Sequence, residues 1–155
     1  PLRFVGVFQN QDIDFIVKIA QQFQLYAVQL HGDETAEFIT ALRAELPESI
    51  RIWKAISVDV THQSAVFFDD VSEIDRFVFD SKSGAQQGGT GETFNWSLIP
   101  AQLKHKILLA GGINPNNIDA ALAQHCVGVD LNSGVESAPG VKDAEKVRSV
   151  FKAIL

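Results

Sequence analysis

Two glycine-containing turns in the last third of the sequence have the composition of a phosphate-binding site. Each follows a short apolar run that predicts a buried parallel strand: residues 107–110 precede Gly111-Gly112, and residues 127–131 precede Asn132-Ser133-Gly134. Backbone N–H groups exposed at two neighbouring strand ends bind a phosphate without a charged side chain. One such turn alone is ordinary turn geometry, but two on successive strands favour a phosphate site.

Asp80 is the candidate proton donor. It ends an apolar run, residues 76–79, and precedes the glycine-rich segment 83–93, which contains Gly88, Gly89 and Gly91. This segment is too long for a tight turn between a strand and a helix, so we interpret it as a mobile lid or a ligand loop. An aspartate at a strand end caps a loop about as often as it catalyses, so its position leaves both roles open.

Two further polar side chains are expected at the same edge as these turns. His31 follows the predicted strand 25–30, and Asp130 lies two residues before Asn132 on the same face of its strand. Each is either a substrate contact or a structural hydrogen-bonding group, and residue type alone does not choose between these roles.

The elements that must position these residues alternate between strand and helix. The predicted strands are residues 3–8, 25–30, 50–56, 76–79, 107–110 and 127–131. The predicted helices are one capped by Asp12, one capped by Asp33 or Thr35, a weak one at 64–68, a short one near Leu98, and those at 116–125 and 142–154. Such alternation predicts a parallel sheet covered by helices, with the ligand at the carboxyl ends of the strands. Because the turn after the first strand, Gln9-Asn10, lacks glycine, a barrel is favoured over a doubly wound sheet. Lys54, inside a predicted strand, is then expected in the barrel interior or near its mouth.

Composition excludes several classes of function. The 155 residues are 46% hydrophobic with a formal net charge of −6 and no block of Lys and Arg, which argues against a nucleic-acid partner but not against a small phosphorylated substrate. No stretch predicts a membrane span or a signal peptide, and a single cysteine, Cys126, excludes an internal disulfide, so we expect a cytoplasmic protein. The histidines and Cys126 lack the spacing of metal ligands, and no cofactor motif is present, so we expect neither a metal nor a cofactor.

Several motifs occur in one order: Val28-Gln29-Leu30-His31-Gly32, Phe79-Asp80-Ser81, Gly88-Gly89-Thr90-Gly91 with Phe94-Asn95-Trp96, Leu108-Leu109-Ala110-Gly111-Gly112, and residues 129–136 with Pro139-Gly140 and Lys142-Asp143. Together they resemble the phosphoribosylanthranilate isomerase family over nearly the whole chain. The resemblance implies an α/β TIM-type (βα)8 barrel, with residues 1–155 as a single domain that forms its C-terminal part. About six βα units are present and the first two are missing, which leaves strands 3–8 and 127–131 as open apolar edges. Since the sequence begins Pro1-Leu2-Arg3 without Met, we expect an excised part of a longer protein, with an indole-glycerol-phosphate synthase domain as a possible preceding partner.

The family's chemistry assigns roles to the candidate residues. The resemblance implies an isomerase of tryptophan biosynthesis that converts N-(5-phosphoribosyl)anthranilate to 1-(2-carboxyphenylamino)-1-deoxyribulose 5-phosphate by an Amadori rearrangement. Asp80 would be the general acid, while the family's basic cysteine belongs to a missing unit, so this fragment would be inactive alone. His31 would bind near the anthranilate ring, and Asp130 near the sugar hydroxyls. The alternatives are a non-catalytic phosphate-binding partial barrel and another phosphosugar barrel isomerase.

Overall fold

The computed structural model describes residues 2–59, 64–65, 72–82, 96 and 99–155. Its main sheet has the hydrogen-bonded strand order β1-β2-β3-β5-β6-β7, with the short β4 antiparallel beside β3. The strands are β1 (Val5–Phe8), β2 (Ala27–Leu30), β3 (Arg51–Asp59), β4 (Ser64–Ala65), β5 (Arg76–Lys82), β6 (Ile107–Leu109) and β7 (Gly128–Val129). The predicted α/β fold with six parallel strands is therefore confirmed. The described residues pack as two compact units, each of which is considered by itself.

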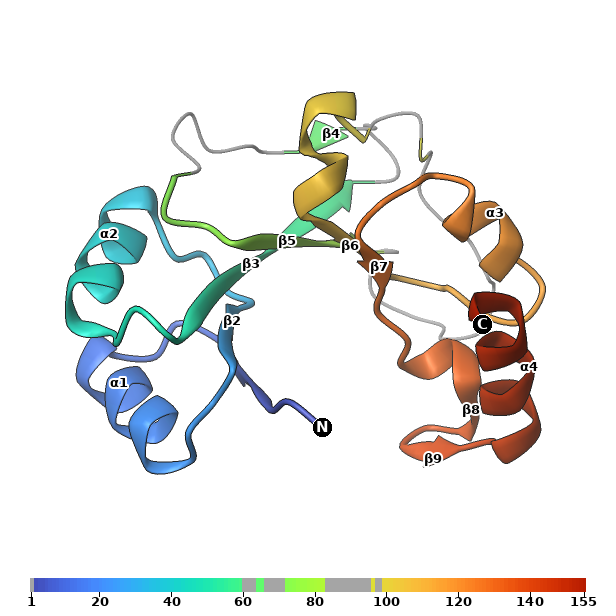
Figure 1. The fold of residues 1–155 in the computed structure, drawn as a ribbon, viewed down its shortest axis with the longest axis horizontal. Helices are drawn as coiled ribbons and strands as arrows, with labels where there is room; N and C mark the ends of the chain where they lie inside the picture. Colours follow the sequence, from blue (N-terminus) through green and yellow to red (C-terminus); the bar gives the residue numbers. More distant parts are fainter. Residues whose placement is uncertain (1, 60–63, 66–71, 83–95, 97–98) are drawn as a thin grey trace. The chain divides into compact units, whose positions relative to one another are not determined.

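The first unit contains residues 2–56 and 72–77 among those described. β1, β2 and the first part of β3 pair in parallel, with Phe8, Leu30 and Lys54 in register. Helices α1 (Ile13–Gln22) and α2 (Ala36–Glu45) lie side by side next to these strands (Figure 1). Ile16 and Ala20, spaced one helical turn apart on α1, are buried. The rings of Phe15 and Phe8 pack edge-on, with their centroids 6.4 Å apart. The helix-covered face of the strands thus forms the core of this unit.

Helix α2 has clear physical boundaries. Of the two predicted caps, Thr35 occupies the N-cap, and its Oγ1 accepts a hydrogen bond from Phe38 N at 3.3 Å. At the other end, the Arg43 guanidinium donates to the carbonyls of Leu46, Pro47 and Ile50 at 2.8–3.0 Å. Arg43 therefore ties the end of α2 to the start of β3 through the carbonyls of the connecting turn.

The second unit contains residues 57–59, 64–65, 78–82, 96 and 99–155 among those described. β6 and β7 pair in parallel, and helices α3 (Ile118–Leu122) and α4 (Ala144–Ile154) lie side by side (Figure 1). Two 3₁₀ helices, η2 (Ala101–Lys106) and η3 (Ser133–Val135), precede β6 and follow β7. A small antiparallel hairpin, β8 (Glu136–Ala138) and β9 (Val141–Lys142), connects η3 to α4.

Several element boundaries differ from the sequence prediction. Ser64 and Ala65 form a strand rather than the start of a helix, because they pair with the end of β3. The closing helix begins at Ala144 and not at Lys142, because the Asp143 carboxylate accepts from the N–H groups of Glu145 and Lys146. Helix α3 is shorter than residues 116–125, since it starts after Asn117 and the chain leaves it before His125, whose φ is 56°.

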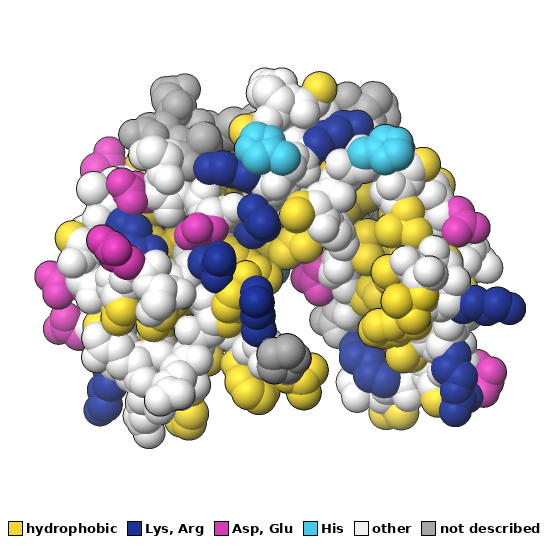
Figure 2. Space-filling model, in the orientation of Figure 1, with side chains coloured by type: hydrophobic (Ala, Val, Ile, Leu, Met, Phe, Trp, Pro, Cys, Tyr) yellow, Lys and Arg dark blue, Asp and Glu magenta, His cyan; other side chains and the backbone are white. Residues whose placement is uncertain are grey.

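β1 and β7 are the edge strands of the main sheet, as the sequence predicts. Leu2, Phe4 and Val7 keep 90%, 66% and 63% of their surface exposed, and Figure 2 shows hydrophobic side chains gathered at this start of the chain. Val127, beside β7, is also exposed. Both edges therefore carry the apolar character that favours pairing with further strands.

Replacement of Thr35 by Ala should lower the free energy of unfolding by about 1 kcal/mol, because the N-cap hydrogen bond to Phe38 is lost. Thr35→Ser keeps the hydroxyl and serves as the matched control. Urea denaturation followed by circular dichroism measures both variants. Equal stability of Thr35→Ala and Thr35→Ser would show that this cap contributes nothing.

Candidate functional site

The turn after β6 has a backbone that only glycine adopts without strain. Gly111 and Gly112 have φ values of 76° and 67°. The carbonyl of Gly112 accepts hydrogen bonds from the side-chain amides of Asn114 and Asn117, both at 3.0 Å. Asn117 Oδ1 in turn accepts from Asn114 N at 2.8 Å. Two asparagines therefore hold this turn rigidly ahead of α3.

The turn after β7 packs directly against the turn after β6. A Cβ atom added at Gly134 would lie 1.8 Å from the carbonyl oxygen of Ile113 and 3.1 Å from Asn114 Cβ. Any larger residue at position 134 would push the two turns apart. The structure thus brings together the two turns that the sequence selected as a phosphate site: Gly111, Gly112, Asn132, Ser133 and Gly134.

Lys142 holds the start of the second turn. Its Nζ donates to the main-chain oxygen of Asn132 at 3.0 Å, to Asn132 Oδ1 at 2.6 Å and to Glu136 Oε1 at 2.6 Å. The hydrogen bond from Lys142, helped by the N–H of Gly140, lowers the pKa of Glu136. Sequence reasoning missed this contact, because it placed Lys142 in the closing helix rather than in the hairpin.

Asp80 and Asp130 lie along the same strand edge of the second unit as these turns. Ala110 N donates to Phe79 O at 2.7 Å, and Asp130 N donates to Leu109 O at 2.8 Å. Asp80 in β5, Gly111 after β6 and Asp130 after β7 therefore belong to three strands that neighbour one another. Asp80 is half-buried, and Asp130 is exposed. Asp80 does not end its strand as predicted, because β5 continues to Lys82.

His31 belongs to the first unit, at the carboxyl end of β2. Its N–H donates to Phe8 O at 2.8 Å, which continues the pairing of β1 with β2. Its imidazole Nδ1 lies 3.2 Å from Nε2 of Gln29, which is almost fully buried. The ring is thus held on one side by a side chain of its own strand.

A buried ion pair lies next to His31. Lys54 Nζ is 3.1 Å from Glu34 Oε2, and the two side chains are only 4% and 2% exposed. Lys54 is in register with Phe8 and Leu30, and its Nζ reaches the carbonyl of Gly32 in the loop at the carboxyl end of β2. Burial raises the pKa of Glu34, but hydrogen bonds from the N–H groups of Asn10 and of Glu34 itself, together with Lys54, outweigh it and lower the pKa overall.

Glu34 was missed by sequence reasoning, although a signal for it exists. A lysine in the middle of a largely apolar strand requires a counter-charge if it is buried. The acidic residues that follow the neighbouring strand, Asp33 and Glu34, are the nearest candidates in the predicted topology.

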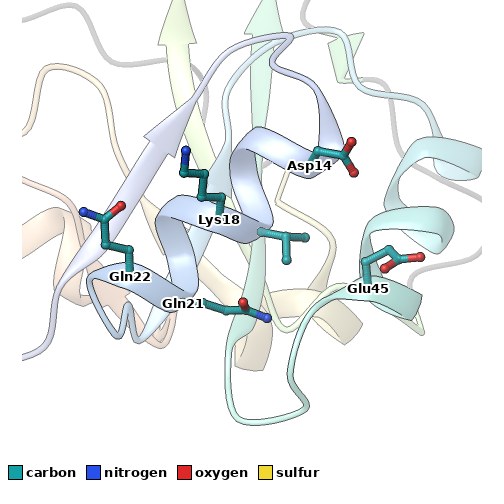
Figure 3. Close-up of a pocket in the computed structure, with 6 residues that line it drawn as sticks. Asp14, Lys18, Gln21, Gln22 and Glu45 are labelled. Carbon is teal, nitrogen blue, oxygen red and sulfur yellow. The ribbon is translucent and has the colours of Figure 1, made fainter.

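One surface groove in the first unit is separate from these strand ends (Figure 3). It is lined by side chains of α1 and α2: Asp14, Val17, Lys18, Gln21, Gln22 and Glu45. Its charges are mixed and no lining residue follows a strand, so it offers no arrangement for catalysis.

Other predictions concern lids, metals and membranes. The predicted lid residues Gly88, Gly89 and Gly91 lie outside the described residues. Within the part of the chain that the structure describes, no three His, Cys, Asp or Glu residues are grouped as a metal site requires. Among the described helices, none has the length and apolar character of a membrane span.

Comparison with known proteins places these residues in a family. The profile of the N-(5'-phosphoribosyl)anthranilate (PRA) isomerase family matches residues 1–153. The tryptophan biosynthesis protein TrpCF of Haemophilus influenzae is 70% identical over 154 residues, which are 99% of this chain and 32% of that protein. The chain thus spans about a third of the length of the curated relatives that it matches.

Solved structures agree in fold. The phosphoribosyl anthranilate isomerase of Thermus thermophilus superposes with a TM-score of 0.75 at 30% identity, covering 99% of this chain and 72% of that one. A phosphoribosyl anthranilate isomerase in complex with reduced 1-(o-carboxyphenylamino)-1-deoxyribulose 5-phosphate superposes with a TM-score of 0.71 at 28% identity, covering 96% and 69%. Since the family profile matches nearly the whole chain and the strand order carries the expected turns, the chain belongs to the N-(5'-phosphoribosyl)anthranilate isomerase family.

Proposed function

We propose that this chain supplies the phosphate-binding and proton-donating parts of a phosphoribosylanthranilate isomerase of tryptophan biosynthesis. The observation that carries the proposal is the contact of Gly134 with the turn after β6, at the same strand edge as Asp80. Substrate and product of this reaction are both sugar phosphates, so one end must be gripped while the other reacts. The relative that binds the reduced product analogue supports this choice of ligand.

The phosphate grip consists of backbone groups. The N–H groups of Gly111 and Gly112 and those of Ser133 and Gly134 bind the phosphate oxygens, because exposed amides in adjacent turns form an anion-binding concavity. This arrangement needs no cationic side chain in contact with the phosphate, which is consistent with a chain of net charge −6. Lys142 acts indirectly, by holding both oxygens of Asn132.

Asp80 is the general acid of the proposed reaction. It protonates the furanose ring oxygen, the C1′–O bond breaks, and the nitrogen lone pair forms a Schiff base with C1′. A general base then removes the proton from C2′, and the resulting enolamine tautomerises to the ketose product. Overall, the proton lost from C2′ is balanced by the proton gained at C1′. The proton that Asp80 gives to the ring oxygen is balanced by the one that the C2′ hydroxyl loses on becoming a carbonyl, and no oxidant or cofactor is consumed. Asp130 binds near the sugar hydroxyls, and His31 binds near the anthranilate ring.

The six parallel strands correspond, in this proposal, to the last six βα units of a single eight-unit barrel domain. Support comes from the edge strands β1 and β7, which carry exposed apolar residues, and from the 72% of the Thermus thermophilus isomerase that the chain covers. The general base is then a residue of another unit. Relatives about three times as long as the matched segment support a further domain, which we propose is an indole-glycerol-phosphate synthase, in a cytoplasmic enzyme.

Replacement of Asp80 by Asn in the full-length protein should lower kcat by at least roughly 100-fold, because general acid catalysis contributes about 10²–10⁴ to rate. Binding of the reduced product analogue should persist, since Asn keeps the shape of the side chain. Steady-state kinetics and calorimetry measure the two effects. An unchanged kcat would contradict the role of Asp80 as general acid, whereas absence of turnover in both proteins with intact ligand binding would favour a phosphate-binding module without chemistry.

Replacement of Gly134 by Ala should weaken competitive inhibition by inorganic phosphate and raise KM, each by roughly tenfold or more. A Cβ atom at this position would lie 1.8 Å from Ile113 O, so the two turns must separate. A displacement of groups that position a substrate by about 1 Å lowers the reaction rate by up to about 100-fold. Gly128→Ala in β7 is the matched control, since its Cβ meets only the end of the Leu108 side chain. Equal inhibition constants in both variants would contradict the backbone grip.

The isolated chain of 155 residues should show no measurable isomerase turnover, because the proposed base is not among its residues. Addition of a fragment that carries the first two βα units of a relative should restore activity through the apolar edges of β1 and β7. Turnover is measured by fluorescence loss of the anthranilate substrate. Full activity of the isolated chain would exclude an essential base elsewhere.

A further inference from the structure

We propose that the buried Glu34–Lys54 pair is a positioning device for His31, and that Gln29 fixes the tautomer that His31 presents. The proposal rests on the proposed function, in which His31 contacts the substrate. Glu34 and Lys54 do not themselves reach the ligand in this account; they act through the strand end that carries the imidazole.

Both peptide groups of His31 are tied to the ion pair. Before His31, the carbonyl of Leu30 accepts from Lys54 Nζ at 3.4 Å. After His31, the N–H of Gly32 donates to the Glu34 carboxylate at 3.0 and 3.2 Å, and the carbonyl of Gly32 accepts from Lys54 Nζ at 2.7 Å. A shift of Lys54 therefore moves the backbone on both sides of the imidazole, and a shift of Glu34 moves the backbone that follows it.

The same carboxylate locks the loop after β1 to the loop after β2. Asn10 N donates to Glu34 Oε1 at 2.9 Å, and Asn10 Oδ1 accepts from Asp33 N at 2.8 Å. A Cβ atom at Gly32 would lie 2.3 Å from Asn10 Oδ1, so the two loops approach as closely as glycine permits. His31 is thus fixed relative to two strand ends rather than one.

The imidazole is oriented by Gln29. An amide nitrogen can only donate, so its 3.2 Å contact requires His31 Nδ1 to accept. The proton of the neutral ring is then on Nε2, which makes Nε2–H the hydrogen-bond donor of the ring. Because Gln29 is itself almost fully buried, the ring has little freedom to exchange roles between its two nitrogens.

A positional role explains why a charged pair occupies this site. Removing two charges from water is costly, and apolar residues of similar volume often stabilise a protein as well or better. Here Lys54 Nζ donates to two carbonyls beside His31 as well as to Glu34, and both Glu34 oxygens accept from the N–H of Gly32. The pair therefore provides a defined geometry that an apolar replacement would not.

A coupling experiment in the full-length enzyme tests this role. The variants are Glu34→Gln with Lys54→Met, which leaves no unpaired charge; His31→Ala; and the combination of all three. Arg43→Met is the matched control, because Arg43 also donates to three oxygens of the first unit but does not touch the His31 strand end. Asn10→Gly, which keeps a permissive backbone at an exposed site, provides a second variant if the buried pair proves essential for folding.

The Glu34→Gln/Lys54→Met protein, here called the pair variant, should have a kcat/KM roughly 10- to 100-fold lower than that of the unmodified enzyme. This is the loss expected when a substrate contact is displaced by about 1 Å. In the His31→Ala background the same substitutions should have less than about a twofold effect, because nothing remains to be positioned. Asn10→Gly should give a smaller loss with the same dependence on His31. Arg43→Met should give equal effects in both backgrounds.

Nitrogen-15 NMR of the histidine rings gives a readout that does not depend on turnover. The His31 signal, assigned by its loss in His31→Ala, should have the Nε2–H pattern in the unmodified protein and shift or broaden in the pair variant but not in Arg43→Met. Multiplicative effects of the pair and His31 on kcat/KM, or an unchanged His31 signal, would overturn the inference alone. A full-length protein without isomerase activity would overturn both the proposed function and this inference.

Discussion

The contact between Gly134 and the carbonyl oxygen of Ile113 is the constraint on which the candidate phosphate site depends. It allows the turns after β6 and β7 to approach each other closely, as the proposed phosphate grip requires. Other features of the second unit maintain this contact: Asn114 and Asn117 hold the carbonyl of Gly112, and Lys142 holds both oxygens of Asn132. A site made of backbone groups requires such supports, because main-chain amides bind an anion only where the fold fixes them.

In the first unit, the loops that follow the strands are held in place by buried charged side chains instead. Its strand ends carry few glycines, so their positions are fixed by a buried carboxylate and a buried ammonium group that take up backbone N–H and C=O groups. In both units the side chains that hold the loops are distinct from the groups proposed to meet the substrate. A few residues can therefore contact the substrate while neighbouring side chains hold the backbone of the loops in position.

Much of the fold was predictable because its signals are local. Apolar runs that end in small residues identified the parallel strands, and Gly111-Gly112 and Ser133-Gly134 identified the turns. The Glu34–Lys54 pair was not predicted, since the partner of a buried lysine is set by strand order rather than by neighbouring residues. The hairpin at Lys142 was missed because strands of two or three residues have no readable period. The end of β5 was predicted too early, at Asp80 instead of Lys82, since a polar residue inside a strand resembles the end of the strand. The catalytic role of Asp80 rests on the family resemblance, because residue type and position alone suit a loop cap equally well.

The most direct test of the account is a crystal structure of the full-length protein with reduced 1-(o-carboxyphenylamino)-1-deoxyribulose 5-phosphate. The phosphate oxygens should lie within about 3 Å of the backbone nitrogens of Gly111 or Gly112 and of Ser133 or Gly134. The Asp80 carboxylate should lie beside the sugar chain, and the His31 ring beside the anthranilate moiety. A phosphate bound away from both turns, with Asp80 remote from the sugar, would contradict the proposed site.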